Sequence, residues 1–163
     1  MSEDLVKAAL KMMPYGFYSI TSRAGDEVNA MVANWVTQVS FKPRQLALGL
    51  QKTCYTHGLI EQGEVFALNI FRKEDSEVIK PFTKGRAKNP DKMQEASYTP
   101  APGTGCPILE GSAAYVECRL VRIVDSGGDH DIVIGEVIGA GVSTPGGADE
   151  TLTLPDLGWS YAG

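Results

Sequence analysis

The sequence is poor in positive charge, in cysteine and in long apolar runs. Its 15 Lys and Arg residues face 20 Asp and Glu residues, so the formal net charge is -5. Because nucleic-acid binding depends on clustered positive charge, we expect no nucleic-acid partner. The 3 cysteines are too few for a disulfide framework or a four-cysteine metal site. No run approaches the roughly 18 apolar residues that span a bilayer, and the first residues lack a secretion signal, so we expect no membrane association and a cytoplasmic location.

Several motifs of catalytic and metal-binding proteins are also missing. Cys54 and His57 have the spacing of a metal-binding pair, but no second pair follows, so we expect no metal site. We expect His57 to be a capping or surface group in the first turn of a helix. The glycine-rich run 135–141 lies in a predicted strand with no helix after it, which excludes a dinucleotide-binding fingerprint. Neither a G-x-S-x-G nucleophile elbow nor a Walker lysine occurs.

Short β-branched and aromatic runs, separated by turn residues, dominate the rest of the chain. At least six strands with short turns and little helix predict a mainly β protein, an antiparallel barrel or sandwich with a few peripheral helices. The chain of 163 residues fits one domain. The patterns predict helices over 2–13, 56–64 and 74–82, with Thr56 as the N-cap of the second, and strands over 15–22, 28–41, 45–52, 65–71, 112–126 and 130–142.

The turn after the third predicted strand has the composition of an anion site. Lys52, Thr53, Tyr55 and Thr56 place one cation and three hydroxyl groups at the start of a helix. A helix N-terminus offers free backbone N–H groups and a partial positive charge, which suits a phosphate. The alternative is a helix cap followed by solvated turn residues.

Two further segments suggest a ligand. If 34–39 is a strand, Asn34 and Gln38 lie on one face with Thr37 on the other, so polar groups occur on both faces. The alternative is a strand whose polar groups bond to neighbouring strands. His130 opens the last strand after a glycine-rich turn, where an imidazole can bond to a substrate. The alternative there is a turn histidine partly in solvent.

Together these segments give the chain its resemblance to a known family. The stretches "NAMVANWVTQVSFKP", "KTCYTHGLIEQGEVFALNIF" and "GDHDIVIGEV" resemble, in order and spacing, the flavin reductase-like family of FMN-binding split barrels, in its flavoredoxin and ferric-reductase-like branch. The resemblance implies a six-stranded antiparallel Greek-key split barrel and a homodimer with FMN near the subunit interface. It implies one FMN-binding domain over 1–163, with a core over about 14–142 and a C-terminal tail over 143–163.

The resemblance also implies roles for individual residues. The strand from Ala33 to Gln38 would run beside the flavin ring and ribityl chain, and Lys52 to Thr56 would bind the phosphate. His130 would lie near the ring, where a nicotinamide or another donor stacks, and is the candidate catalytic residue. The implied cofactor-binding residues are Ala33, Asn34, Trp35, Val36, Thr37, Gln38, Lys52, Thr53, Cys54, Tyr55, Thr56, Phe71, Phe82, Lys84 and Arg86.

These features predict a flavin-dependent oxidoreductase. NAD(P)H or a reduced protein carrier would reduce bound FMN, and electrons would pass to free flavin, ferric iron or a redox partner protein. A second hypothesis is an FMN-binding electron carrier with no nicotinamide activity of its own. A third is a degenerate β-barrel that only dimerises.

Overall fold

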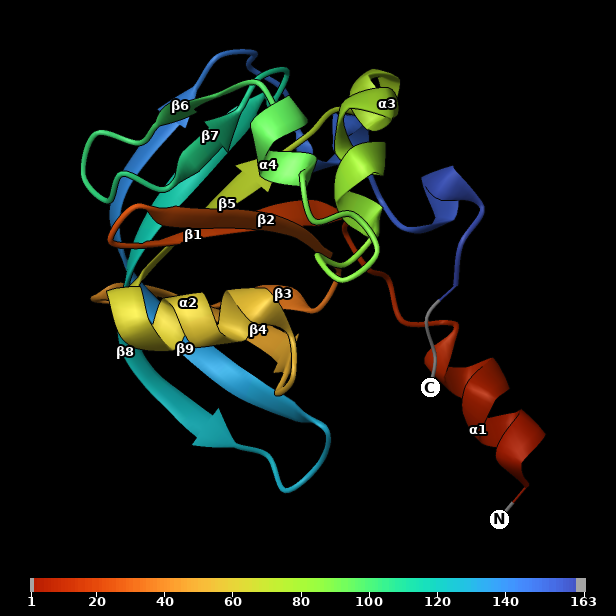
Figure 1. The fold of residues 1–163 in the computed structure, drawn as a ribbon. Coiled ribbons are helices and arrows are strands. Elements are labelled where there is room, and N and C mark those ends of the chain that lie inside the picture. Colours follow the sequence, from red (N-terminus) through yellow and green to blue (C-terminus); the bar gives the residue numbers. More distant parts are fainter. Residues whose placement is uncertain (1, 161–163) are drawn as a thin grey trace.

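The structure is mainly β, as the sequence predicts. The computed structural model describes residues 2–160 (Figure 1). Its strands are β1 Tyr18–Ala24, β2 Glu27–Ala33, β3 Val36–Phe41, β4 Arg44–Gln51, β5 Val65–Ile70, β6 Tyr98–Pro100, β7 Pro107–Leu109, β8 Ala114–Asp125 and β9 His130–Val142. The α-helices are α1 Glu3–Leu10, α2 Tyr55–Gly63, α3 Ser76–Ile79 and α4 Lys92–Glu95. Single 3-10 turns occupy Lys73–Asp75, Lys80–Thr83, Ala148–Glu150 and Pro155–Leu157.

Seven strands form one antiparallel sheet in the order β2-β1-β5-β8-β9-β4-β3. The two edge strands, β2 and β3, follow each other in the chain, so the sheet curls round to bring its ends together. Strands β6 and β7 form a separate small ribbon. Strands β8 and β9 form a long hairpin. Their pairing register shifts at two points, which bends the sheet.

The predicted strand over 28–41 is two strands, and this explains why the sheet has one strand more than the six expected. The chain leaves β2 after Ala33 and enters β3 at Val36. Between them, the Trp35 carbonyl accepts a hydrogen bond from the Gly49 amide at 2.9 Å, so the chain has already turned toward β4. The apolar, β-branched composition is the same on both sides of the break, so it gave no sign of the turn.

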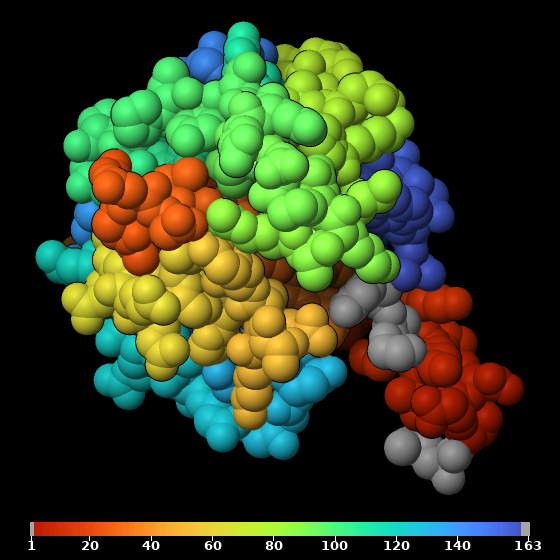
Figure 2. All heavy atoms as spheres, viewed as in Figure 1, coloured from red at the N-terminus to blue at the C-terminus, as the bar shows by residue number. Residues whose placement is uncertain are grey.

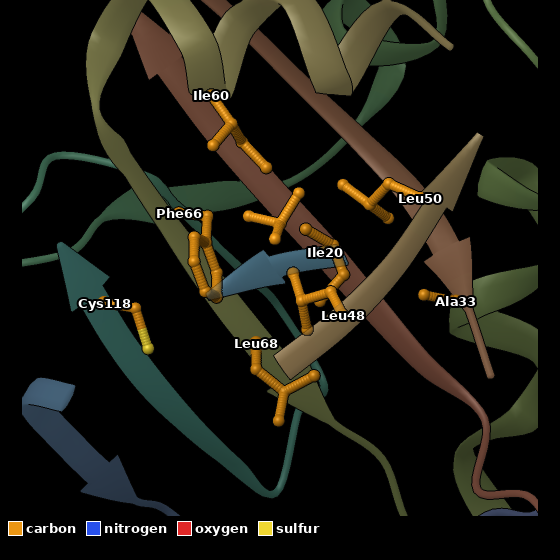
Figure 3. Close-up of a cluster of buried hydrophobic side chains, with 9 residues drawn as sticks. Ile20, Ala33, Leu48, Leu50, Ile60, Phe66, Leu68 and Cys118 are labelled. Carbon is orange, nitrogen blue, oxygen red and sulfur yellow. The ribbon is translucent and has the colours of Figure 1, made fainter. Parts of the chain in front are cut away.

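Side chains from both halves of the sheet meet in one hydrophobic core (Figure 3). Phe66 on β5 and Leu48 on β4 are both almost fully buried, although they come from strands on different sides of the sheet order. Each such side chain contributes about 1.5–3 kcal/mol through burial. The core consists of Ile20, Ala33, Leu48, Leu50, Ile60, Phe66, Leu68, Cys118 and Val133.

A second hydrophobic cluster packs the segment after β5 against β2 and the residues just before β1. Phe71, Phe82 and Leu152 are buried in it beside Phe17 and Ala30. The Leu152 amide donates to the Phe71 carbonyl at 2.9 Å, and the Phe17 amide donates to the Leu152 carbonyl at 3.1 Å. The cluster thus holds the chain around residues 80–92 next to β2.

Helix α1 stands apart from the sheet (Figure 1). It has the acidic first turn that the sequence predicts, with Glu3 and Asp4 at its positive end, but it contains no buried residue. None of the helices within residues 2–160 is long and apolar enough to cross a membrane.

Candidate functional site

A cavity of about 710 Å³ opens between the β2–β3 break, the turn after β4 and the segment that follows Phe82. Figure 2 shows this face, where the chain around residues 30–35 is recessed between the turn after β4 and the residues of the eighties. Ligand pockets for small molecules and cofactors have volumes of about 300–1,000 Å³. The cavity is therefore large enough for a mononucleotide.

One end of the cavity is the N-terminus of α2. Thr53, Cys54, Tyr55 and Thr56 line it, and Cys54 is the N-cap in place of the predicted Thr56. Within residues 2–160 no side-chain hydrogen bond caps the helix. The His57 amide already donates to the Cys54 carbonyl at 3.2 Å, so the Tyr55 and Thr56 N–H groups are the ones that the start of the helix can offer a ligand. Thr56 is fully buried, and its hydroxyl accepts a hydrogen bond from Asn29 Nδ2 at 2.9 Å. These groups form a donor-rich end that suits an anion.

Lys92 brings a positive charge to the same cavity. Its side chain is only 2% exposed, and its Nζ donates to the Lys84 carbonyl at 3.3 Å. Within residues 2–160 it has no carboxylate within salt-bridge distance. Burial, and then the nearby Arg86 charge, lower the pKa of Lys92. A buried ammonium without a counter-ion is costly, and an anionic ligand would stabilise it.

Two buried amide atoms that line the cavity also lack hydrogen-bond partners. Asn29 Oδ1 is an acceptor and Asn34 Nδ2 is a donor, and neither has a partner within the described part of the chain. Buried polar side-chain atoms are normally hydrogen-bonded. The cavity therefore offers an unused donor and an unused acceptor, beside the Lys92 charge, to a ligand with polar groups along its length.

The other end of the cavity is aromatic. The rings of Trp35 and His130 have their centroids 4.8 Å apart at an interplanar angle of 59°. A Cβ atom at Gly49 would lie 3.1 Å from the Trp35 ring, so glycine lets this ring lie against the β4 backbone. His130 Nδ1 lies 2.8 Å from Asp129 Oδ1, and this hydrogen bond lowers the pKa of Asp129. A planar ligand can pack at this end while its anionic end reaches α2.

Most of the chain matches a known family. The profile of the flavin reductase like domain covers residues 10–157. The chain belongs to this family. It is 31% identical over 138 residues to diflavin flavoprotein A 1 of Synechocystis sp., covering 84% of this chain and 24% of that protein. It is 34% identical over 140 residues to the high molecular weight rubredoxin of Moorella thermoacetica, covering 85% of this chain and 60% of that protein.

A solved structure shares the fold. The NADH:FAD oxidoreductase SgcE6 of Streptomyces globisporus has a TM-score of 0.74 and 26% sequence identity, over 85% of this chain and 81% of that chain. The chain spans about a quarter of the length of the diflavin flavoproteins that it matches. It therefore corresponds to one part of those relatives.

The structure brings most of the residues implied by the flavin reductase-like resemblance to this cavity. Its lining includes Ala33, Asn34, Trp35, Thr53, Cys54, Tyr55, Thr56, Phe82, Arg86 and His130. The lining does not include Val36, Thr37, Gln38, Lys52, Phe71 or Lys84. Phe71 is fully buried in the second cluster, and Val36, Thr37 and Gln38 continue into β3 beyond the break.

Lys52 belongs to a separate charged cluster behind the turn. Its Nζ lies 2.6 Å from Asp125 Oδ1 and 3.7 Å from Asp131 Oδ1. The hydrogen bond to Asp125 raises the pKa of Lys52 and lowers that of Asp125. His57 Nε2 lies 2.8 Å from Asp131 Oδ2, and both residues are 9% exposed. The prediction of a surface or capping role for His57 is therefore wrong, because the Asp131 carboxylate provides a buried partner.

Sequence reasoning missed several residues that line the cavity. No local sequence motif identified Asn29, Met31 or Lys92 as cavity residues. Phe17 and Trp159, which also line the cavity, come from opposite ends of the chain. The Phe17 and Trp159 rings meet edge to face, 5.7 Å apart at 81°. One signal was present for Lys92, since the basic residues of the chain gather modestly between Lys80 and Lys92.

Proposed function

We propose that this chain binds FMN in the cavity and acts as a flavin-dependent oxidoreductase. The observation that carries the proposal is Lys92, a buried ammonium that has no carboxylate partner among the described residues, in a cavity that also contains the N-terminus of α2. A phosphate dianion satisfies both features. Family membership and the aromatic far end of the cavity support a flavin in preference to another phosphate ester.

In this proposal the residues of the chain bind the flavin, orient it and restrict the approach of other molecules to it. Lys92, Thr53 and the α2 N–H groups suit the phosphate, and Asn29 Oδ1 and Asn34 Nδ2 suit polar groups along the ligand. His130 is placed to hold a proton or a hydrogen bond at the aromatic end, where Asp129 orients its ring. Flavin, when bound, supplies hydride acceptance and one- or two-electron release.

The proposal includes a homodimer of Greek-key split barrels, each built on the seven-stranded sheet of this chain, with residues 1–163 as one FMN-binding domain. Exposed apolar side chains on three strands of the sheet support an interface between copies. Ile132, Ile138 and Val142 on β9 are exposed, and so are Val124 on β8 and Val39 on β3. Val124 and Ile132 are cross-strand partners, and exposed apolar side chains that lie together mark interaction sites.

The electron donor and acceptor divide the proposal into two forms. In the first, NADH or NADPH reduces the bound flavin, which passes electrons to free flavin, ferric iron or a redox protein. In the second, the chain is an electron carrier that a partner protein reduces. The second form is supported by relatives of which this chain covers only a part, including one named a rubredoxin.

Binding and reduction can be tested in sequence. Titration with FMN should give saturable binding, and riboflavin, which lacks the phosphate, should bind more weakly. Protein that binds no FMN would refute the proposed function. Anaerobic stopped-flow mixing of the FMN-loaded protein with NADH and NADPH then separates the two forms, because rapid loss of oxidised-flavin absorbance indicates the reductase and no loss indicates the carrier.

A further inference from the structure

Three side chains from three separate elements meet at the anion end of the cavity. Arg86 Cζ lies 4.3 Å from the centroid of the Tyr55 ring, as in a cation–π contact. Glu27 Oε2 accepts a hydrogen bond from the Tyr55 hydroxyl at 3.0 Å and lies 3.3 Å from Arg86 Nη2. Arg86 Nη1 also donates to the Val28 carbonyl at 3.2 Å. We call Glu27, Tyr55 and Arg86 the exit cluster.

The exit cluster joins the walls of the cavity across its anion end. Glu27 begins β2, Tyr55 begins α2, and Arg86 lies in the loop between Phe82 and α4. Tyr55 and Arg86 line the cavity, whereas Glu27 lies behind them and its side chain is 61% exposed. A ligand that extended past the anion end on this side would meet the Tyr55 ring and the Arg86 guanidinium, and the Glu27 carboxylate lies next to both.

We propose that the exit cluster makes this cavity selective for FMN over FAD. This inference rests on the proposed function, because it assumes a flavin whose phosphate lies at the N-terminus of α2. FMN ends at that phosphate, whereas FAD continues through a second phosphate to an adenosine. The ring and guanidinium occupy the path of this extension, and the Glu27 carboxylate repels the added negative charge.

The fold alone does not determine whether the cavity accepts FMN or FAD, so this selectivity comes from side chains. SgcE6, which has a similar fold, is named an NADH:FAD oxidoreductase. In this chain the glutamate also neutralises much of the Arg86 charge, which would otherwise attract a pyrophosphate. Specificity often depends on such a repulsive element placed against the wrong ligand.

The main alternative is that the exit cluster only fastens the loop before α4 to the rest of the protein. In that case its loss would weaken FMN and FAD alike, because both flavins share the isoalloxazine, the ribityl chain and the first phosphate. The proposal instead requires FAD affinity to rise relative to FMN affinity in the same variant.

The experiment measures dissociation constants of FMN and FAD for the full chain by quenching of flavin fluorescence. Its variants are Glu27→Gln, which removes the charge and keeps a hydrogen-bond acceptor, and Tyr55→Ala, which opens the path. Glu61→Gln is the matched control, because it removes an exposed carboxylate from the same helix as Tyr55. Circular dichroism confirms that each variant is folded.

We expect the wild type and Glu61→Gln to bind FMN at least about 10-fold more tightly than FAD, and both exit-cluster variants to bind FAD at least about fivefold more tightly than the wild type does. Equal affinities of the wild type for the two flavins would overturn the proposal, as would variants in which FAD affinity does not rise. A wild type that binds neither flavin would instead refute the proposed function itself.

Discussion

Replacement of Lys92 by methionine should affect flavin binding and protein stability in opposite directions. The side chain is 2% exposed, and the Lys84 carbonyl is its one hydrogen-bond acceptor within the described residues. A hydrogen bond between charged groups contributes about 1.5–3 kcal/mol, so Lys92→Met should weaken FMN binding by about 10- to 150-fold. Riboflavin has no phosphate, and its affinity should change little.

The flavin-free protein should become more stable in the same variant. Methionine fills a similar volume without a buried charge, so the free energy of unfolding should rise by on the order of 1 kcal/mol near neutral pH. Burial lowers the pKa of Lys92 from its ordinary value of 10.5. The unfolded chain therefore holds this proton to higher pH than the folded protein, and wild-type stability rises as pH climbs from the folded pKa toward 10.5. The difference in unfolding free energy between Lys92→Met and the wild type should therefore become smaller over that pH range.

Two measurements decide the outcome. Isothermal titration with FMN and riboflavin gives the affinities, and urea denaturation of the flavin-free protein at several pH values gives the stabilities. Lys88→Met is a suitable control, since Lys88 is an exposed lysine of the same segment and does not line the cavity. The reasoning is refuted if FMN affinity is unchanged in Lys92→Met, or if riboflavin affinity falls as much as FMN affinity.

Three further changes test other parts of the molecule. Gly135→Ala should lower the free energy of unfolding by about 1–3 kcal/mol in urea, because its Cβ would lie 2.4 Å from the Phe66 ring; a loss below about 0.5 kcal/mol would contradict this packing. Burial raises the pKa of Cys106 to about 11 and that of Cys118 to about 12. A thiol reagent at about pH 8 should therefore modify at most one thiol of the native protein, and it should modify all 3 after unfolding. His130→Ala should slow reduction of bound flavin by the better nicotinamide donor with little change in FMN affinity, and an unchanged stopped-flow rate would end the catalytic role given to it.

Local patterns predicted most strands of the large sheet, and they located the turn after β4 that lines one end of the cavity. The Lys52–Thr56 turn could be identified because a strand end, hydroxyl residues and a helix start follow one another within a few residues. The strands were recognisable for the same reason, since β-branched composition and turn residues are local signals. What these signals could not supply was the break at Asn34 and Trp35, which depends on a backbone hydrogen bond to Gly49.

The identity of the lysine that lines the cavity shows why the rest of the site could not be predicted from the sequence. Lys52 lies in the predicted turn, but Asp125, which is 73 residues further along the chain, forms an ion pair with it. Lys92 is far from that turn in sequence, yet the second hydrophobic cluster brings its segment to the cavity. Which lysine lines the cavity is decided by tertiary packing, and no pattern within a single segment indicates it.

The order of strands in the sheet has a consequence for synthesis of the chain on the ribosome. The hairpin of β3 and β4 joins the other strands of the sheet through β9, whose first residue, His130, pairs with Gln51. A nascent chain that has not yet extruded β9 can pair β1, β2 and β5 and can pack α2 against β1 and β2, but the β3–β4 hairpin still lacks its partner strand in the sheet. Pairing between such distant segments is slow to form. The wall of the cavity that Trp35, Gly49 and His130 form is thus one of the last features that a newly made chain acquires.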